Sequence, residues 1–347
     1  MISRESSLRI ARLASEVLKA AAVEKRSQDG YTRVDPVAIA ETQGISVMLQ
    51  PMDRLLGAFL AEDDVGILLN SQRPSGMVHM TCAHELGHYF LEHGTTLDDQ
   101  LDYDTGAGDK ELEADQFAYS LMVPQWLFTT VMKGQGWGLP SLQDAGIVYQ
   151  LSLRMGVSYA AMVWSLARMK RIPHAQASML AKMQLAQIKQ SLSPPGTKLS
   201  RFQDVWLLRP RDKDFILEPR THDLLMIDLP AHTGSGYLWS FSEAQGEGYA
   251  LRPVLEDERG SRPGSRDDVW VGTPPSLRYS LDVPPTTEES FERRLDTLHL
   301  REVQPWRGAK SSRDSLNLVS KAEMIQDGLT NESRLQWIGA QPAQGGQ

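Results

Sequence analysis

The sequence predicts an α+β protein with two domains: a mainly helical first half that contains a few short strands, and a β-sandwich in the second half. Three observations predict this fold class. Apolar residues recur at helical spacing through much of the chain up to Leu192. The Pro-Pro-Gly segment at 194–196 cannot continue a helix and is typical of a linker. Short apolar runs separated by Pro, Gly and Asp follow it, as in the strands of a sandwich.

The first half begins with helices. At 8–18, apolar residues repeat every three to four positions and predict an amphipathic helix. A short helix is predicted at 35–41, where an Asp suits the N-cap and the following Pro suits the first helical position. Aliphatic runs bounded by Gly, Asp and Asn predict strands at 45–49 and 65–69. Helical periodicity then predicts further helices at 76–93, at 110–122 and in shorter pieces up to Leu192.

The second half is predicted to contain the sandwich followed by a polar segment. Its expected strands lie at 205–208, 215–217, 224–227 and 269–271. The residues after Trp306 are polar and weakly periodic, which is typical of a chain end outside a core. We therefore expect a first domain over residues 1–195, the sandwich over 196–310 and a polar C-terminal extension over 311–347.

The composition excludes several classes of protein. Apolar residues make up 41% and charged residues 23% of the 347 positions, which excludes a mainly disordered chain. A net charge of −8 argues against a general surface for nucleic acids. The single cysteine, Cys82, excludes an intramolecular disulfide and fits a reducing compartment. Since neither a membrane span nor a signal-peptide core is apparent, we expect a cytoplasmic protein without a membrane partner.

A cluster of histidines carries the chemistry. Four of the eight histidines lie within residues 79–93, and two of them form a His-Glu-x-x-His motif. His84 and His88 are four positions apart, so on a helix both imidazoles lie on one face and can bind the same zinc ion. Glu85 lies about 100° around that helix, where its carboxylate can face a water on the metal and act as general base. The pattern therefore predicts a catalytic zinc site.

A catalytic zinc needs a third protein ligand, and the predicted helix at 110–122 supplies the candidates. Glu111 and Asp115 are four positions apart and share a face, so Glu111 can bind the metal while Asp115 accepts the free N–H of a ligand imidazole. Glu113 lies nearly opposite Glu111 on an ideal helix and is the alternative ligand. Further acids lie at 98–106, which is predicted to be a loop.

Other residues near the motif are expected to be structural. His79 and His93 each lie five positions from the nearest predicted ligand and off the ligand face. Cys82 precedes the first ligand by two positions, so it is expected to be a small buried apolar residue. The pattern does not identify the donor that stabilises an oxyanion in zinc hydrolysis.

Three stretches of the first half, VDPVAIAETQGI at 34–45, TCAHELGHY at 81–89 and ELEADQFAYSLMVP at 111–124, resemble the ImmA/IrrE family of zinc metallopeptidases. The resemblance extends over about residues 5–170. It implies a zincin-like metallopeptidase domain with a helical extension, in which His84, His88 and Glu111 bind zinc and Glu85 is the base. It also implies a cytoplasmic endopeptidase whose substrate is a helix-turn-helix repressor or an antitoxin, in stress responses or toxin–antitoxin control.

The same resemblance raises the question of how a substrate is held. In zincin-like folds an edge strand beside the active-site helix pairs with the substrate backbone, which is recognition by strand addition. Residues 65–70 are the candidate for this role, and an ordinary core strand is the alternative.

Residues 149–164 have the outline of a helix-turn-helix, with a turn at Gly156 and an N-cap at Ser158. The pair contains few cations: Arg154 lies in the first helix, and the second has none before Arg168. Because DNA binding needs cations that contact phosphates, we expect these helices to pack within the peptidase fold and expect no direct DNA binding.

Three stretches of the second half, at 229–239, 271–275 and 304–306, resemble the loops of chagasin-like cysteine-peptidase inhibitors. The resemblance covers about residues 200–308 and implies an immunoglobulin-like β-sandwich with three loops at one end. Departures from the pattern, such as His232 and Gln304, argue against inhibition of papain-type enzymes. We expect the loops instead to bind a protein partner or to gate the zinc cleft.

Three functions are consistent with these features. The first is a zinc-dependent endopeptidase that cleaves a cytoplasmic regulatory protein. The alternative is a non-catalytic zinc-containing sensor or protein-binding module that acts through the C-terminal β-sandwich, and a third is a peptidase inhibitor. Glu85 distinguishes them, because a structural zinc site has no use for a carboxylate beside an open coordination position.

Overall fold

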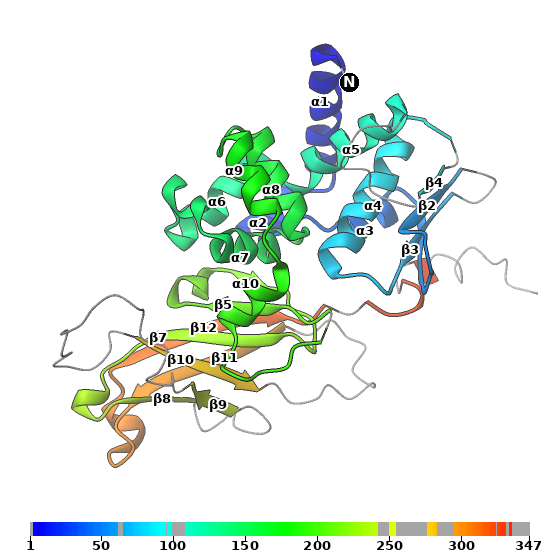
Figure 1. The fold of residues 1–347 in the computed structure, drawn as a ribbon. Helices are drawn as coiled ribbons and strands as arrows, with labels where there is room; N and C mark the ends of the chain where they lie inside the picture. Colours follow the sequence, from blue (N-terminus) through cyan, green and yellow to red (C-terminus); the bar gives the residue numbers. More distant parts are fainter. Residues whose placement is uncertain are drawn as a thin grey trace, which may run out of the picture. The chain divides into compact units, whose positions relative to one another are not determined.

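The computed structural model describes residues 3–61, 65–94, 96–98, 108–200, 202–241, 250–254, 276–282, 295–323, 325–330 and 333–334. These residues form helices and several mixed sheets, which confirms the predicted α+β class (Figure 1). The chain divides into two compact units. The first comprises Met1–Val131, Leu151–Ala181 and Ile325–Gln347, and the second comprises Met132–Gln150 and Lys182–Met324. Among the described residues, no helix is both long and apolar enough to cross a bilayer.

The first unit combines helices with a five-stranded sheet. Its helices are α1 (Arg4–Ala20), α2 (Val23–Gln28), α3 (Pro36–Thr42), α4 (Ser75–Phe90), α5 (Asp109–Met122), α8 (Tyr159–Arg168) and α9 (His174–Ala181). Its strands are β1 (Ser46–Gln50), β2 (Gly57–Leu60), β3 (Gly66–Asn70), β4 (Thr96–Asp98) and β13 (Gly328–Leu329). Two further helices, α6 (Gln125–Gln135) and α7 (Ala145–Met155), contribute residues to both units.

The sheet of the first unit has the order β13-β1-β3-β2-β4. β1 runs parallel to β3, and the other pairs are antiparallel. α4 packs on β2 and β3, and α5 packs between α4 and α1. This arrangement places α4 at the centre of the unit, which explains why side chains on all of its faces from Val78 to His88 are buried.

The local sequence explains where the helices of the first unit begin. The Ser3 hydroxyl accepts a hydrogen bond from the Ser6 N–H and caps α1, and the Asp35 carboxylate accepts one from the Ala38 N–H and caps α3. The helices predicted at 8–18, 35–41, 76–93 and 110–122 correspond to α1, α3, α4 and α5.

The strand predicted at 65–69 is β3, and it lies inside the sheet. β1 pairs with it along one side, and β2 pairs with it along the other. Since both of its edges are hydrogen-bonded within the sheet, the hypothesis that residues 65–70 pair with a substrate is wrong. Among the described strands, β4 lies at the sheet edge beyond β2.

The second unit contains two four-stranded sheets. Its strands are β5 (Val205–Leu208), β6 (Ile216–Leu217), β7 (Leu224–Pro230), β8 (Leu238–Phe241), β9 (Ala250–Pro253), β10 (Ser276–Asp282), β11 (Leu295–Val303) and β12 (Asp314–Lys321). The sheets have the orders β5-β7-β10-β9 and β6-β12-β11-β8. Trp206 and Leu225 from one sheet and Leu298 and Leu318 from the other line one small apolar cavity. The strand expected at 269–271 lies outside the described residues.

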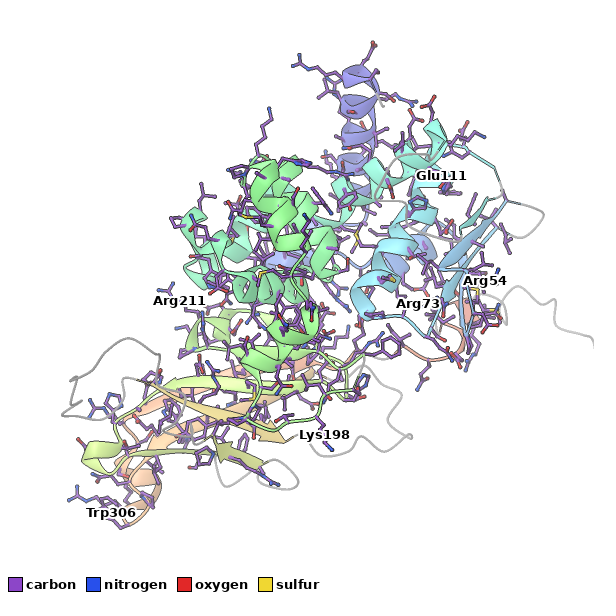
Figure 2. The ribbon with its side chains drawn as sticks, in the orientation of Figure 1. Arg54, Arg73, Glu111, Lys198, Arg211 and Trp306 are labelled. Carbon is purple, nitrogen blue, oxygen red and sulfur yellow. The ribbon has the colours of Figure 1, made fainter. Side chains whose placement is uncertain are left out.

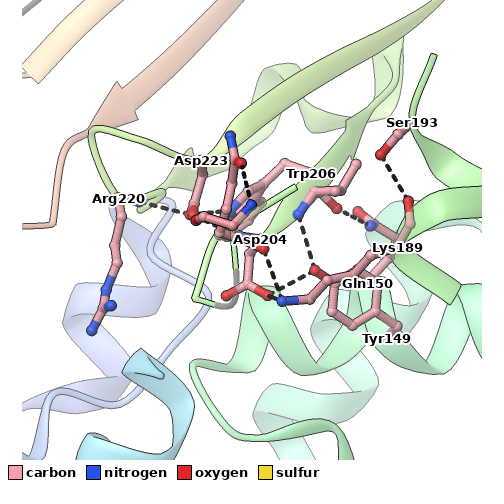
Figure 3. A network of polar contacts seen from close by, with 11 residues as sticks. Tyr149, Gln150, Lys189, Ser193, Asp204, Trp206, Arg220 and Asp223 are labelled. Atoms are coloured by element: carbon pink, nitrogen blue, oxygen red, sulfur yellow. Dashed lines mark hydrogen bonds and ion pairs between the residues drawn. The ribbon is translucent and has the colours of Figure 1, made fainter. Parts of the chain in front are cut away.

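Helical residues bind the edge of β5 through a polar network (Figure 3). The Gln150 amide donates to the carbonyl of Val205 at 2.7 Å and accepts from the N–H of Leu207 at 2.8 Å. The Tyr149 hydroxyl accepts from the N–H of Val205 at 2.9 Å and donates to Asp204 at 2.8 Å. β5 lies at the edge of its sheet, so in the described part of the chain no strand forms hydrogen bonds with these backbone groups. The side chains of Tyr149 and Gln150 form them instead. They explain why this stretch of helix belongs to the second unit.

Two strands lie in the C-terminal region that is expected to be a polar extension. β12 belongs to the second unit, whereas β13 pairs with β1 and extends the sheet of the first unit, where Figure 1 shows it in red. The Ser333 hydroxyl accepts a hydrogen bond from the N–H of Val47 at 2.9 Å, and the N–H of Thr330 donates to the carbonyl of Val47 at 3.1 Å. The Thr330 hydroxyl donates to the Glu41 carboxylate. The domain bounds expected at 195 and 310 stay predictions.

These contacts predict that Ser333→Ala weakens the sheet of the first unit. Ser333 is fully buried, so its removal leaves the N–H of Val47 without its acceptor, which costs about 1–3 kcal/mol. We expect faster hydrogen exchange in β1, measured by mass spectrometry, while Ser315→Ala, at an exposed position of β12, leaves exchange unchanged. Equal exchange in the two variants would contradict this assignment.

Asp35 predicts a pH dependence of stability. Burial raises the pKa of Asp35, but Arg33, Arg26 and the N–H of Ala38 outweigh it, so the pKa is lowered from 3.8. A carboxylate with a lowered pKa stabilises the folded state above pH 3.8, and this contribution is lost as the pH falls through the lowered value. Asp35→Asn retains a cap acceptor but not the charge.

We therefore expect Asp35→Asn to lower the free energy of unfolding at pH 7 by about 0.2–1 kcal/mol. The difference from the unchanged protein should shrink as the pH falls below 3.8 in urea titrations. Asp29→Asn, at the exposed end of α2, controls for the loss of one acidic charge. A difference that stays constant with pH would be the contrary result.

Candidate metal centre

The crossing of α4 and α5 builds the site. Gly87 faces Ala114 across this crossing, and a Cβ added at Gly87 would lie 2.9 Å from the Cα of Ala114 and 3.0 Å from its carbonyl oxygen. Only a residue without a side chain allows the two backbones to approach so closely. The crossing places His84 and His88 of α4 opposite Glu111 of α5, which Figure 2 labels.

Three side chains converge at the crossing. The Nε2 atoms of His84 and His88 lie 3.1 Å apart, and Glu111 Oε2 lies 3.2 Å from the first and 3.4 Å from the second. Each of the three residues offers one ligand atom within 4.8 Å of the others. Both histidines are buried, whereas the Glu111 side chain is 34% exposed. This group could hold a metal ion that is reached from solvent on the Glu111 side.

The second nitrogen of His84 contacts a carboxylate. Nδ1 of His84 lies 3.0 Å from Oδ1 of Asp115, one turn beyond Glu111 on α5. A carboxylate accepts, so a neutral His84 carries its proton on Nδ1 and a lone pair on Nε2. Nε2 therefore faces the cluster as a donor for a metal, which is the support that metal-binding imidazoles require. The geometry matches the role predicted for Asp115.

Glu111 has a lowered pKa in this cluster. Its close contact with His84 is the largest cause, and His88 adds to it against the opposing effect of burial. The structure therefore provides an anionic ligand beside two imidazoles.

Glu85 lies beside the ligands on α4 and is fully buried. Its carboxylate lies against the backbone of β2: a Cβ added at Gly57 would lie 2.8 Å from Glu85 Oε1 and 2.5 Å from a methyl carbon of Thr81. The glycine at this position therefore provides the room for the carboxylate. No motif in the sequence includes Gly57, so its role beside Glu85 could not be predicted from the sequence.

The structure separates the two candidate third ligands. Glu113 does not join the histidine pair. Its Oε1 accepts from the Ser6 hydroxyl at 2.5 Å and lies 3.5 Å from Arg9, and its Oε2 lies 3.5 Å from His93. The hydrogen bond from Ser6 is the largest cause of its lowered pKa. Glu113 thus faces α1, while Glu111 faces the cluster. The acids at 99–106 lie outside the described residues.

His93 makes a contact that the sequence does not predict. It is expected off the ligand face, and its Nδ1 lies 3.0 Å from Nδ1 of His88, the ring nitrogen of His88 that points away from the cluster. α4 ends at Phe90, and Glu92 adopts a positive φ of 58°, so the chain turns back and leaves the helical spacing. The only sign of this contact in the sequence is that His93 lies five positions after the motif. By contrast, His79 contacts Arg33 and the carbonyl of Gly156, away from the cluster.

The remaining expected features are placed as follows. Cys82 is fully buried, and burial is the main cause of its raised pKa. In the helix pair α7 and α8, Arg154 is 1% exposed, and Arg168 stacks over the Tyr119 ring at 3.6 Å from its centroid. Both cations therefore contribute to packing within the protein.

Two of the three loops that resemble inhibitor loops lie within the described residues. Nδ1 of His232 lies 2.9 Å from both carboxylate oxygens of the buried Glu302, and the Gln304 amide donates to the carbonyl of Ser235 at 3.0 Å. Trp306, labelled in Figure 2, is 69% exposed. The loop expected at 271–275 lies outside the described residues.

The first half of the chain matches a known protein family. Residues 40–165 match the family model described as IrrE N-terminal-like domain, Peptidase_M78, which confirms the resemblance to ImmA/IrrE metallopeptidases over that region. Among solved structures, the chain is similar to the crystal structure of the cysteine protease inhibitor EhICP2 from Entamoeba histolytica, at 18% identity and a TM-score of 0.25, with 36% of this chain and 100% of that chain covered. Comparison with curated proteins gives no significant match.

The cluster predicts that a chelator destabilises the metal-loaded protein. With free metal at a hundredfold excess over its Kd, binding stabilises the folded state by about 2.7 kcal/mol, so removal should lower the thermal midpoint measured by scanning fluorimetry. Glu111→Gln should reduce this chelator effect, and Glu16→Gln, at an exposed position of α1, should preserve it. A midpoint that does not respond to chelator would contradict metal binding.

Proposed function

We propose that the chain is a zinc-dependent endopeptidase that cleaves a cytoplasmic regulatory protein. The convergence of two imidazole nitrogens and one carboxylate oxygen carries this proposal. The match of residues 40–165 to a metallopeptidase family model supports it.

The donor set fits zinc. Ligand atoms about 2.0–2.2 Å from a tetrahedral zinc lie roughly 3.3–3.6 Å from one another, and the three distances here are 3.1, 3.2 and 3.4 Å. Two histidines and one carboxylate leave a fourth position open for water or substrate. When bound, zinc would supply a Lewis acid that polarises the scissile carbonyl and acidifies a water.

Glu85 is the residue that we propose as the general base. It follows the first ligand on α4, and its buried carboxylate lies between α4 and the backbone at Gly57. It would accept the proton of the attacking water and return it to the leaving amine. Asp115 would hold the ring of His84 in its metal-binding orientation.

The substrate class is proposed from the family resemblance. A helix-turn-helix repressor or an antitoxin would be cut in the cytoplasm, where the buried free thiol of Cys82 would also remain reduced. The second unit, proposed as an immunoglobulin-like sandwich, would bind a protein partner through its loops.

A second candidate function is a zinc-containing sensor or protein-binding module without catalysis. The exposed indole of Trp306 favours it, because exposed aromatic residues on loops commonly serve as anchors in protein interfaces. Activity separates the two candidates, since a sensor has no need of the Glu85 carboxylate.

The proposal predicts that Glu85→Gln abolishes cleavage while zinc binding is retained. The chain would be co-expressed with each protein encoded beside it, and the fragments identified by mass spectrometry. Loss of a general base should slow cleavage by about 10²–10⁴-fold, while the zinc content measured by elemental analysis stays unchanged. Glu16→Gln, at an exposed position of α1, serves as the matched control. If Glu85→Gln cleaves as fast as the control, the peptidase assignment is wrong.

A further inference from the structure

The second ring nitrogen of the ligand His88 faces another imidazole, whereas that of His84 faces a carboxylate. Nδ1 of His88 lies 3.0 Å from Nδ1 of His93, and the ring centroids lie 5.1 Å apart at 68°. The side chain of His93 is only 6% exposed. This contact is therefore a buried one between two rings.

The other nitrogen of His93 faces Glu113. Nε2 of His93 lies 3.5 Å from Oε2 of Glu113, and Oε1 of Glu113 accepts from the Ser6 hydroxyl and lies near Arg9. Ser6 and Arg9 belong to the first turns of α1. A continuous row of polar contacts thus runs from α1 to His88.

The direction of these contacts follows from the donor and acceptor chemistry. Nε2 of His88 faces the cluster, so a metal-binding His88 carries its proton on Nδ1 and donates it toward Nδ1 of His93. His93 must then carry its own proton on Nε2, where Glu113 can accept it. Each ring therefore donates through one nitrogen only. The row ends at the Glu113 carboxylate, which Ser6 and Arg9 contact.

We propose that His93 is a positioning residue for the metal ligand His88, and that Glu113 and Ser6 hold His93 in the required tautomer and orientation. This inference rests on the proposed metal site. It gives His88 the counterpart of the support that Asp115 gives His84. It also assigns a role to Glu113, which is not one of the three residues that converge in the cluster.

The backbone around His93 is held without its imidazole. The N–H of His93 donates to the carbonyl of His88 at 2.9 Å, and Lys110 donates to the carbonyl of His93 at 2.8 Å. Replacement of the side chain therefore leaves the turn after α4 with its own hydrogen bonds. The ring nitrogens remain to act on His88 and Glu113.

The test measures zinc affinity by competition with a chromophoric chelator, using the full chain. His93→Leu removes the acceptor and should weaken zinc binding about 10–100-fold, the usual cost of removing such a partner. His93→Asn places an oxygen near the position of Nδ1 and should restore most of this affinity. Ser6→Ala, at a partly exposed position, should weaken binding to a smaller extent.

His79→Leu is the matched control, because His79 is a buried histidine of α4 that contacts Arg33 and Gly156 instead of the cluster. It should leave zinc affinity unchanged even where it lowers the thermal midpoint. An unchanged affinity in His93→Leu would overturn the inference, and so would equal losses in His93→Leu and His93→Asn, which indicate packing alone. A chain that binds no zinc at all would instead overturn the proposed function.

Discussion

The candidate metal centre depends on the close crossing of α4 and α5 at Gly87 and Ala114. A side chain at position 87 would meet the backbone of α5 within 3.0 Å, and forcing extra atoms into such a contact typically costs 1–3 kcal/mol. The crossing brings Glu111 and Asp115 against two histidines on the neighbouring helix. Ligand and support therefore come from successive turns of one helix, so a shift of α5 would move both together.

The local parts of this centre could be predicted from the sequence. The spacing of His84 and His88, and that of Glu111 and Asp115, are properties of single helices, and one helical turn separates the members of each pair. Helical geometry also places Glu113 away from Glu111, and the structure agrees. The contact of His93 with His88 could not be predicted in this way, because it depends on a backward turn with a positive φ at Glu92.

The order of the strands in the first unit's sheet could not be predicted from the sequence either. The apolar run of β3 predicts a strand, but whether a strand lies at an edge depends on partners elsewhere in the chain. Here those partners include β1 and β2 on its two sides. Similarly, the residues after 310 are polar on the whole, and the contacts that join β13 and the residues after it to β1 include backbone and hydroxyl hydrogen bonds. Composition alone therefore favours a loose extension where the structure has strands.

The position of β13 in the chain has a consequence for synthesis. Val47 and its acceptor Ser333 lie 286 positions apart, and at about 5–20 residues per second a ribosome needs roughly 15–60 s to make the intervening chain. During that time the outer edge of β1 lacks the strand that covers it in the finished protein. An uncovered edge is a template for pairing with other chains. The edge of β1 in the nascent protein therefore stays open to other chains until β13 leaves the ribosome.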